Sequence, residues 1–472
     1  MLRKSFLLVL VLFVFTVSFA QKRQVKAVAQ VTVMNPMLSY SDVVSALLKK
    51  GLTEQQAYQN LAELTGTIGG RLSGSPQAAR AVVWAKNLME KLGFQHVRLQ
   101  HVMVPHWVRG KIEKAWIADR RGRKNIPLAM CALGGSVATP RKGITAEVIE
   151  VHSLDEARAL GAEAKGKIIF FNRRMNPTLV STFAAYSGAV DQRDGGASAA
   201  ASVGGVGALV RSMTLVVDNV PHTGVMHYQD SIPKVPTAAL STFAANRLSA
   251  ELERRPRLRV HFVLDCKTLP DVKSANVIGE LPGTQLPNEV VVMGGHLDSW
   301  DKGKGAHDDG AGVTQSIEAL RLIKELGLKP KRTIRVVLFM NEENGSRGGK
   351  KYAAQLPVNE KAVAALESDA GGFDPRAFGV SADSSVFQKI ASWASLLQPT
   401  DICSIRRGGG GEDISYLKGK ASALIGLEPS NQRYFDYHHS DKDVLANVNP
   451  RELELGAVAL ASLAYFISEE GL

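Results

Sequence analysis

Cysteine is scarce in this chain of 472 residues, of which 45% are hydrophobic and 22% are charged. Its three cysteines, Cys131, Cys266 and Cys403, form an odd and sparse set, which excludes a disulfide framework. No two of them have the spacing of metal ligands, and a single bridge stays open. Repeats and low-complexity segments are absent as well. The composition is that of a globular protein, and the length predicts two or three domains.

Long hydrophobic runs are missing beyond the N-terminus. One apolar run follows Arg3 and Lys4, is short for a membrane span, and ends before a small-x-small cleavage site at residues 18–20. This pattern predicts a secretory signal peptide at residues 1–20 and a mature chain that begins near Gln21. We therefore expect secretion into an extracellular, periplasmic or lumenal space, with no membrane partner after cleavage. An uncleaved membrane anchor is the alternative.

A basic stripe interleaved with aromatic residues is missing too. The formal net charge is +12, but the basic residues are scattered in short clusters such as the one at residues 120–124. Nucleic acids and anionic surfaces attract concentrated positive charge. The scattered pattern favours a solvated basic surface and no nucleic-acid partner.

The texture of the sequence changes along the mature chain. Residues 21–110 are interpreted as the N-terminal part of a catalytic domain, with Thr53 as a helix cap and a helix at residues 78–92 that ends at Gly93. Residues 111–270 alternate short β-like runs with loops rich in glycine, alanine and serine, and few of their side chains are suited to chemistry. We predict a separate, mostly β domain there, inserted into the surrounding one.

Residues 271–472 show the pattern of an α/β catalytic domain. Short apolar runs at residues 290–293, 334–340 and 363–366 alternate with helical stretches, as expected of parallel strands covered on both faces. The predicted fold is a mostly parallel sheet sandwiched by helices, with the β-rich domain inserted.

Acids and histidines follow the ends of these strands. They are His296, Asp298, Asp308, Glu342, Glu343 and Asp369, and a late loop adds His438 and His439. One such histidine is commonly structural, and a pair of glutamates is commonly a solvated turn. Ligands, however, bind beyond the carboxyl ends of parallel strands, and burying several acids together is costly without a positive partner. Four such segments predict a zinc site, with one carboxylate shared by two ions about 3.5–4 Å apart.

The loop at residues 294–312 combines acids with many glycines, which let the backbone turn tightly around a charged site. Asp298 lies two residues beyond His296, so a short turn can bring its carboxylate to the second imidazole nitrogen and orient a zinc ligand. We count Asp298 among the catalytic residues. His307 has no such partner in the sequence, and we interpret it as structural.

Several motifs have a family resemblance. They lie at residues 69–76, 104–110, 221–224, 274–283, 296–300 and 437–439. With them, nearly all of the mature chain resembles the di-zinc exopeptidases that have the aminopeptidase/glutamate carboxypeptidase catalytic fold. Residues 165–169 are similar to part of a protease-associated domain, which implies that the inserted region is one. The resemblance implies a zinc-dependent peptide hydrolase.

The resemblance also implies a set of metal ligands. His296 and Asp369 would hold one zinc ion, and Glu343 and His439 would hold the other. Asp308 would bridge them. Two Zn²⁺ ions per chain are therefore expected.

Further roles follow from the same resemblance. Glu342 corresponds to the family's general base, and His438 to a residue that helps to stabilise the oxyanion. Asp309 and Asp443 stand where the family carries additional acids. Residues 408–413 resemble a glycine-rich loop near the active site.

The expected activity is hydrolysis of dipeptides or short peptides by metal-activated water, with a peptide as the partner. Because the family often dimerises, a second copy of the chain is a candidate partner too. Three alternatives stay open: a binding protein that has lost catalysis, an interaction protein based on the inserted domain, and an aminopeptidase on longer peptides. Arg406, Arg407 and Arg433 are candidates for binding a substrate carboxylate, or are surface arginines.

Overall fold

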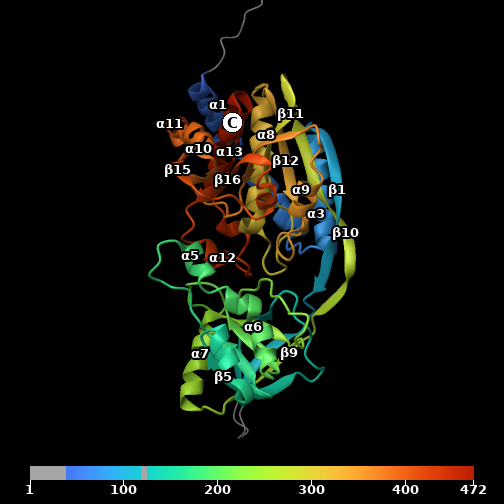
Figure 1. Ribbon diagram of the computed structural model, residues 1–472, viewed down its shortest axis with the longest axis vertical. Coiled ribbons are helices and arrows are strands. Elements are labelled where there is room, and N and C mark those ends of the chain that lie inside the picture. Colours follow the sequence, from blue (N-terminus) through green and yellow to red (C-terminus); the bar gives the residue numbers. More distant parts are fainter. Residues whose placement is uncertain (1–38, 119–124) are drawn as a thin grey trace, which may run out of the picture. The chain divides into compact units, whose positions relative to one another are not determined.

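Two eight-stranded sheets organise the protein in this computed structural model, which describes residues 39–118 and 125–472 (Figure 1). The predicted signal peptide and the basic cluster at residues 120–124 both lie outside the described residues. Within those residues, no helix combines the length and the hydrophobicity needed to cross a bilayer.

The first sheet contains the strands predicted around the candidate site. In spatial order they are β1 (Gln95–Val108), β10 (Lys267–Leu281), β12 (Arg332–Phe339), β11 (Leu286–His296), β13 (Lys361–Glu367), β16 (Ala421–Pro429), β14 (Pro375–Ala382) and β15 (Ser404–Arg407). The central strands β12, β11, β13 and β16 run parallel, whereas β1, β10 and β14 are antiparallel to their inner neighbours. The α/β prediction is confirmed, with a sheet that is parallel at its centre and mixed at its edges.

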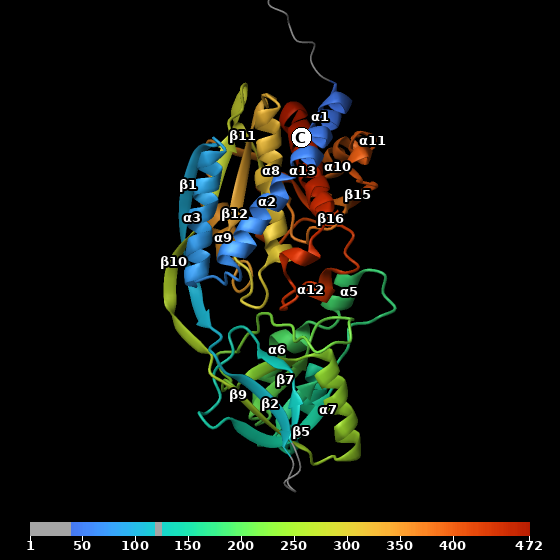
Figure 2. The same ribbon diagram turned by 180° about the vertical axis from the view of Figure 1, so that it is seen from behind.

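Both faces of this sheet are buried. Val291 and Met293 of β11 pack into the core on one face, and Val290 and Val292 pack into the core on the other. The first face is covered by α1 (Tyr40–Glu54), α3 (Pro76–Lys91), α8 (Ala311–Glu325) and α13 (Pro450–Glu470), and the second by α9 (Arg347–Ala354) and the 3-10 helix η5 (Asp413–Leu417). Helices α8 and α13 lie side by side (Figures 1 and 2). Full burial of a valine or methionine side chain stabilises the fold by about 1.5–3 kcal/mol relative to leaving it exposed. Because both faces of these strands are covered, apolar residues are favoured at every position along them.

Local signals set the helix ends. Ser39 and Asp42 form a capping box at the start of α1. The predicted cap at Thr53 is wrong, because Thr53 lies in the last turn of α1 and its hydroxyl donates to the Lys49 carbonyl at 2.6 Å. The helix expected at residues 78–92 is α3, and Gly93 follows it with a φ of 70°.

The second sheet lies between Glu113 and Leu264 in the sequence. Its spatial order is β3 (Ile126–Leu128), β2 (Glu113–Ala118), β9 (Arg259–Leu264), β5 (Ile144–Val151), β6 (Ile168–Phe171), β7 (Gly207–Arg211), β8 (Thr237–Leu240) and β4 (Met130–Ala132). Strands β5 to β8 are parallel, and helices lie between strands along the chain. These helices are α4 (Leu154–Ala159), α5 (Thr182–Ser187), α6 (Asp191–Ser202) and α7 (Thr242–Arg254). That this region is a protease-associated domain stays a prediction.

The description of this region as mostly β is incomplete, and α6 shows why. Stretches rich in glycine, alanine and serine are expected to be loops throughout this region, but residues 191–202, which have this composition, form a helix. Alanine is the best helix former, and small side chains let a helix approach its sheet closely. A Cβ on Gly196 would lie 3.1 Å from the Phe171 ring of β6. The remaining α-helices of the described residues are α2 (Gln56–Glu63), α10 (Ser384–Ala391), α11 (Ala394–Leu397) and α12 (Tyr434–Tyr437).

All three cysteines are free thiols, so the bridge left open by the sequence does not form. Cys131 and Cys266 are buried, and burial raises their pKa values to about 12 and about 11. Cys403 is exposed. The two buried thiols are therefore unreactive parts of the core.

Candidate metal centre and active site

The carboxyl ends of three neighbouring parallel strands bring the predicted residues together. β11 ends at His296, Glu342 and Glu343 follow β12, and Asp369 follows β13. The register places His296 beside Phe339, the last residue of β12. The loops after these strands therefore leave from the same edge of the sheet, where α/β proteins bind their ligands.

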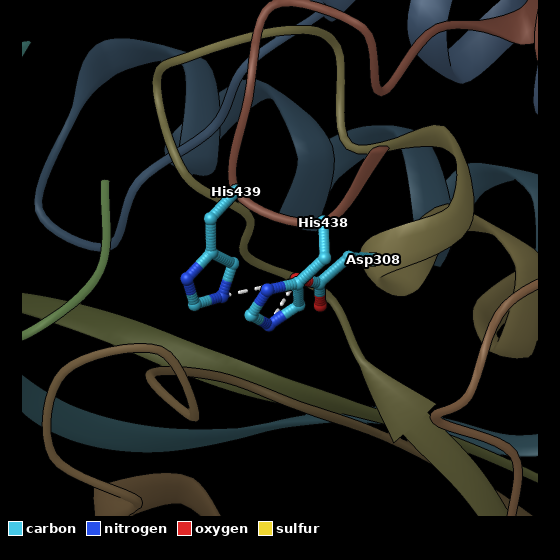
Figure 3. Close-up of side chains that lie close together, drawn as sticks. All are labelled: Asp308, His438 and His439. Carbon is cyan, nitrogen blue, oxygen red and sulfur yellow. Dashed lines mark ion pairs between the residues drawn. The ribbon is translucent and has the colours of Figure 1, made fainter. Parts of the chain in front are cut away.

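Asp308 lies at the centre of a group that we call the strand-end cluster. Its members are His296, Asp308, Glu342, Glu343, Asp369, His438 and His439. Its Oδ1 is 3.1 Å from Nε2 of His296, and its Oδ2 is 3.1 Å from Nε2 of His439. His438 is slightly farther, with 3.7 Å between Nε2 and the same Oδ2. Figure 3 shows both late histidines directed at this carboxylate. The two oxygens of Asp308 therefore face two different imidazoles.

Each side of the cluster has a second carboxylate. Nε2 of His296 is 3.4 Å from Oδ1 of Asp369, and Nε2 of His439 is 3.1 Å from Oε2 of Glu343. Three overlapping groups have ligand atoms within 4.8 Å of one another: Asp308 with His438 and His439, His296 with Asp308 and Glu343, and His296 with Asp309 and Asp369. The predicted ligands thus form one continuous cluster.

The cluster fits a metal cation. Oδ2 of Asp308 is buried and has no well-aligned hydrogen-bond donor, although His439 is close to it. Burial and the charge of Asp308 raise the pKa of Glu343 to about 7. At Asp308 itself, the neighbouring imidazoles outweigh burial and hold the pKa well below its usual value. Imidazole and carboxylate donors without a thiol suit zinc.

Glu342 and Glu343 lie in different surroundings. The Glu343 side chain is 2% exposed, and its Oε1 accepts a hydrogen bond from the Trp300 amide at 3.0 Å. The Glu342 side chain is 20% exposed, and its Oε2 is 4.0 Å from Nε2 of His296. Burial, with the charge of Asp369, raises the pKa of Glu342 well above its usual value. One glutamate is enclosed in the cluster, and the other faces open space.

Asp298 is placed differently from the prediction. Nδ1 of His296 lies 3.0 Å from the backbone carbonyl of Asp298, not from its carboxylate. The carboxylate instead accepts the amides of Asn341 and Glu342, at 2.6 and 3.2 Å. A two-residue turn brings the nearer backbone atom to the ring, which leaves the side chain free to hold the loop that carries the two glutamates. Asp298 is therefore a positioning residue for Glu342.

Comparisons with known proteins agree with this geometry. A profile of peptidase family M28 matches residues 276–464. Carboxypeptidase Q from Bos taurus is 36% identical over 434 residues, which span 91% of this chain and 89% of the bovine protein. The chain belongs to peptidase family M28. As a member of it, the protein is a zinc-dependent peptidase.

Two solved structures have the same fold. The peptidase M28 precursor from Shewanella amazonensis SB2B is 33% identical, with a TM-score of 0.87 over 91% of this chain and 97% of that one. The zinc aminopeptidase BSAP from Bacillus subtilis is 18% identical, with a TM-score of 0.63 over 88% and 95%. The latter likeness shows the shared fold alone.

Asp443 of this M28 peptidase holds the segment that carries Asp308. Its Oδ1 accepts the amides of Ala306 and His307, at 3.0 and 2.6 Å, and its Oδ2 accepts the amide of Asp308 at 3.2 Å. Burial and the charge of Asp308 raise the pKa of Asp443 to about 7. This carboxylate fixes the backbone beneath Asp308.

Arg71 supports the same loop and was missed as an individual residue. Its Nε donates to the Leu297 carbonyl at 2.6 Å, and its Nη1 donates to the carbonyls of Lys304 and Gly305. Its side chain is fully buried. The only signal in the sequence was its place in the motif at residues 69–76, which carried no assigned role.

Asp309 and two glycines pack tightly behind His296. Oδ2 of Asp309 accepts the His296 amide at 3.0 Å, and Oδ1 accepts the Gly312 amide at 2.8 Å. A Cβ on Gly295 would collide with the Asp309 carboxylate, and one on Gly312 with the Ser368 carbonyl. These glycines are needed for close approach.

His307 is structural, as predicted. Its ring stacks on Phe373 and Tyr437, with centroids 4.3 and 5.3 Å apart. Nδ1 accepts the Gly372 amide and Nε2 lies 3.1 Å from the Asn447 carbonyl. Burial lowers the pKa of His307 to about 4, so the ring stays neutral.

The second-sheet region reaches the site, contrary to the expectation that few of its side chains serve chemistry. Nδ1 of His222 lies 2.7 Å from the His438 carbonyl, and the Thr223 amide donates to the His439 carbonyl at 2.9 Å. His439 has a φ of 59°, which non-glycine residues rarely adopt. These two contacts hold the backbone that presents both late histidines. Their sequence signal was the motif at residues 221–224.

A cavity of about 480 Å³ opens over the strand-end cluster. Phe183, Tyr186 and Arg193 from the second-sheet region line it, together with six residues of the cluster: Asp308, Glu342, Glu343, Asp369, His438 and His439. An adjoining cavity of about 840 Å³ is lined by residues 408–412 and reaches Asp369. The glycine-rich loop therefore lies next to the site.

Two of the arginines considered from the sequence line only the adjoining cavity. Arg406 and Arg407 are there, and Arg406 lies 3.6 Å from the carboxylate of Glu428. Arg433 lies over the Tyr437 ring, 5.2 Å from its centroid. None of the three lines the cavity over Asp308.

Proposed function

We propose that this M28 peptidase is a secreted two-metal exopeptidase that cleaves dipeptides or short peptides, with Glu342 as its general base. The observation that carries the proposal is the geometry of Asp308. Its two oxygens face two separate groups, His296 with Asp369 and His439 with Glu343. A carboxylate placed in this way suits two ions that share it.

The residues of the chain supply the remaining chemistry. Zinc, when bound, supplies a Lewis acid that polarises the peptide carbonyl and acidifies water. The Glu342 carboxylate accepts a proton from the attacking water and then donates it to the leaving amine. The Asp298 carboxylate supports this step because it holds the Glu342 amide. Glu343, enclosed in the cluster, serves as a ligand.

His438 is the proposed oxyanion donor. Burial and the adjacent His439 lower the pKa of His438 well below its usual value, so it is neutral at pH 7. A neutral imidazole carries one N–H that can donate to a developing negative charge. The ring also lines the cavity in which the substrate would bind.

The size of the cavity supports a short substrate. About 480 Å³ is enough for a ligand of a few residues, and side chains of α5 and α6 are part of the cavity wall. Carboxypeptidase Q, with 36% identity, supports exopeptidase activity. An aminopeptidase on longer peptides is the second candidate, because the adjoining cavity extends the space beside Asp369.

The decisive experiment measures metal content and hydrolysis together. The purified mature protein should hold close to two equivalents of zinc and hydrolyse dipeptides faster than pentapeptides. One equivalent with full activity and no gain on zinc titration would contradict the shared carboxylate. Zinc binding without hydrolysis of any peptide would instead indicate a binding protein.

Secretion has its own test. The basic residues before an apolar run, followed by a small-x-small site, support cleavage before Gln21. N-terminal sequencing of the exported protein should begin at that residue. A cytoplasmic protein that keeps Met1 would contradict secretion and leave the peptidase proposal intact.

A further inference from the structure

Arg193 is a buried arginine in the cavity over the strand-end cluster, and it has no carboxylate partner among the described residues. It lies in the first turn of α6 and is 7% exposed. Its Nε donates to the Val225 carbonyl at 3.2 Å, and its buried Nη1 has no acceptor. Burying a guanidinium without an anionic partner is costly, so this arrangement suits the binding of an anionic group.

The surroundings of Arg193 hold it in place. The guanidinium lies 5.5 Å from the centroid of the Tyr186 ring, and Tyr186 in turn packs edge-on against His438 at 5.4 Å. On its other side, a Cβ on Gly224 would collide with the guanidinium. Arg193 is therefore held in place close to the strand-end cluster. A residue that positions a substrate must be held in this way, because catalysis depends on orientation.

The other bases that line this cavity are already occupied. Nζ of Lys350 donates to the Gly345 carbonyl at 2.9 Å and lies over the Tyr416 ring. His227 pairs with Asp194. Lys350 also lacks a carboxylate partner among the described residues, but it is exposed to solvent. Arg193 is the buried arginine in this cavity whose charge the described carboxylates do not pair, and its planar fork suits the two oxygens of a carboxylate.

We propose that Arg193 binds a carboxylate of the peptide substrate and makes the enzyme select for it. The inference rests on the proposed peptidase activity and deepens it. The carboxylate is either the C-terminus of a short peptide or an acidic side chain next to the scissile bond. A C-terminal carboxylate at this distance from the cluster would limit cleavage to the last peptide bonds of a chain.

Three dipeptide probes separate the two sources: alanyl-leucine, alanyl-leucine amide and alanyl-glutamic acid amide. The zinc-loaded wild-type enzyme should cleave alanyl-leucine with a kcat/KM about 10- to 100-fold above that of its amide, the range expected for a hydrogen bond to a charged group. In Arg193→Met this preference should disappear, mainly through KM, while the amide is cleaved as before. If alanyl-glutamic acid amide is the preferred probe and loses its advantage in Arg193→Met, the bound carboxylate is the side chain.

Two further variants control the test. Arg193→Lys keeps the charge but not the fork, and should retain part of the preference. Arg406→Met removes an arginine of the adjoining cavity and should leave the preference unchanged. Zinc content, measured on every variant, should stay at the wild-type value. Equal losses on the free acid and the amide in Arg193→Met would show a structural role and overturn the proposal.

Binding measurements keep the inference testable without turnover. Calorimetry with leucine and leucine amide on the zinc-loaded wild-type protein should show at least about 10-fold tighter binding of the free acid, and Arg193→Lys should narrow the gap. Equal binding of leucine and its amide, with cleavage of all three dipeptide probes at the same rate, would overturn the role of Arg193 even if Arg193→Met does not fold. Absence of hydrolysis with preserved leucine discrimination would contradict the proposed function and support Arg193.

Discussion

Two groups of buried acids in this protein are neutralised in different ways. In the strand-end cluster around Asp308, the acids face imidazoles and open onto a cavity. In the helix cluster, formed by Glu318 and Arg321 of α8 with Glu454 of α13, Glu318 receives two hydrogen bonds from Arg321 at 2.7 and 2.6 Å. Burial and the adjacent Glu318 raise the pKa of Glu454 to about 9, so Glu454 is protonated. A group of buried acids can therefore be compensated by a basic side chain such as Arg321 or by a bound proton, as on Glu454. Such a group indicates a metal site only where neither kind of compensation is present.

The largest effect is expected from removing the internal cation of the helix cluster. Arg321→Met leaves Glu318 buried without its partner, which should lower the free energy of unfolding by about 3–5 kcal/mol. Urea denaturation measures this loss. Zinc content and kcat should stay unchanged, because the helix cluster is separate from the metal ligands.

Arg255→Met is the matched control for this change. Arg255 pairs with Glu251 on the surface of α7, and 42% of its side chain is exposed. Its loss should cost under about 1 kcal/mol. Similar costs for the two arginines would contradict the distinction between a buried cluster and a surface pair.

Metal removal tests the other cluster. Zinc present at 100 to 1,000 times its dissociation constant stabilises the folded state by about 2.7–4.1 kcal/mol, so chelation should lower the melting temperature measurably. Chelation should destabilise the Arg321→Met variant by the same free energy as the wild-type protein, because the effects of distant and independent sites add. An unchanged melting temperature after complete chelation, checked by elemental analysis, would show that the strand-end cluster binds no metal in the folded protein.

The paired glutamates divide the strand-end cluster into base and ligand. Glu342→Gln keeps the side-chain shape but cannot accept a proton, so kcat should fall at least about 10²-fold with full metal content. Glu343→Gln should weaken one metal position, and excess zinc should restore part of its activity. Steady-state kinetics with elemental analysis distinguishes the two, and near-normal turnover in a fully loaded Glu342→Gln enzyme would exclude the proposed base.

The smallest effect is a pH dependence of stability caused by Glu454. The folded protein keeps the Glu454 proton up to about pH 9, whereas the unfolded chain loses it near the ordinary value of 4.5. The folded state thus binds more protons between these values, and its stability should fall as the pH rises. In Glu454→Gln, the loss of unfolding free energy between pH 5 and pH 9 should be smaller than in the wild-type protein by at least about 1 kcal/mol. Urea denaturation curves recorded across this pH range measure the slope for both proteins.

The sequence by itself determined the central strands and the residues at their ends. Apolar runs long enough for a strand, followed at once by His296, the Glu342–Glu343 pair or Asp369, are local patterns. Parallel strands in register bring such ends to one edge of the sheet, so the cluster followed from the pattern. Helix ends were less secure, since the cap assigned to Thr53 was wrong and a capping box at Ser39 was overlooked.

Only the tertiary structure decided which atoms meet across the chain. The Asp298 carbonyl rather than its carboxylate reaches His296, because turn geometry and the competing amides of Asn341 and Glu342 settle that choice. Arg193 comes from a stretch without a recognised motif, and His222 from the motif at residues 221–224, to which no role was assigned. Both reach the site because α6 and the segment before β8 fold against it. Such contacts join residues far apart in sequence, and their free energy depends on burial and alignment that no local pattern records.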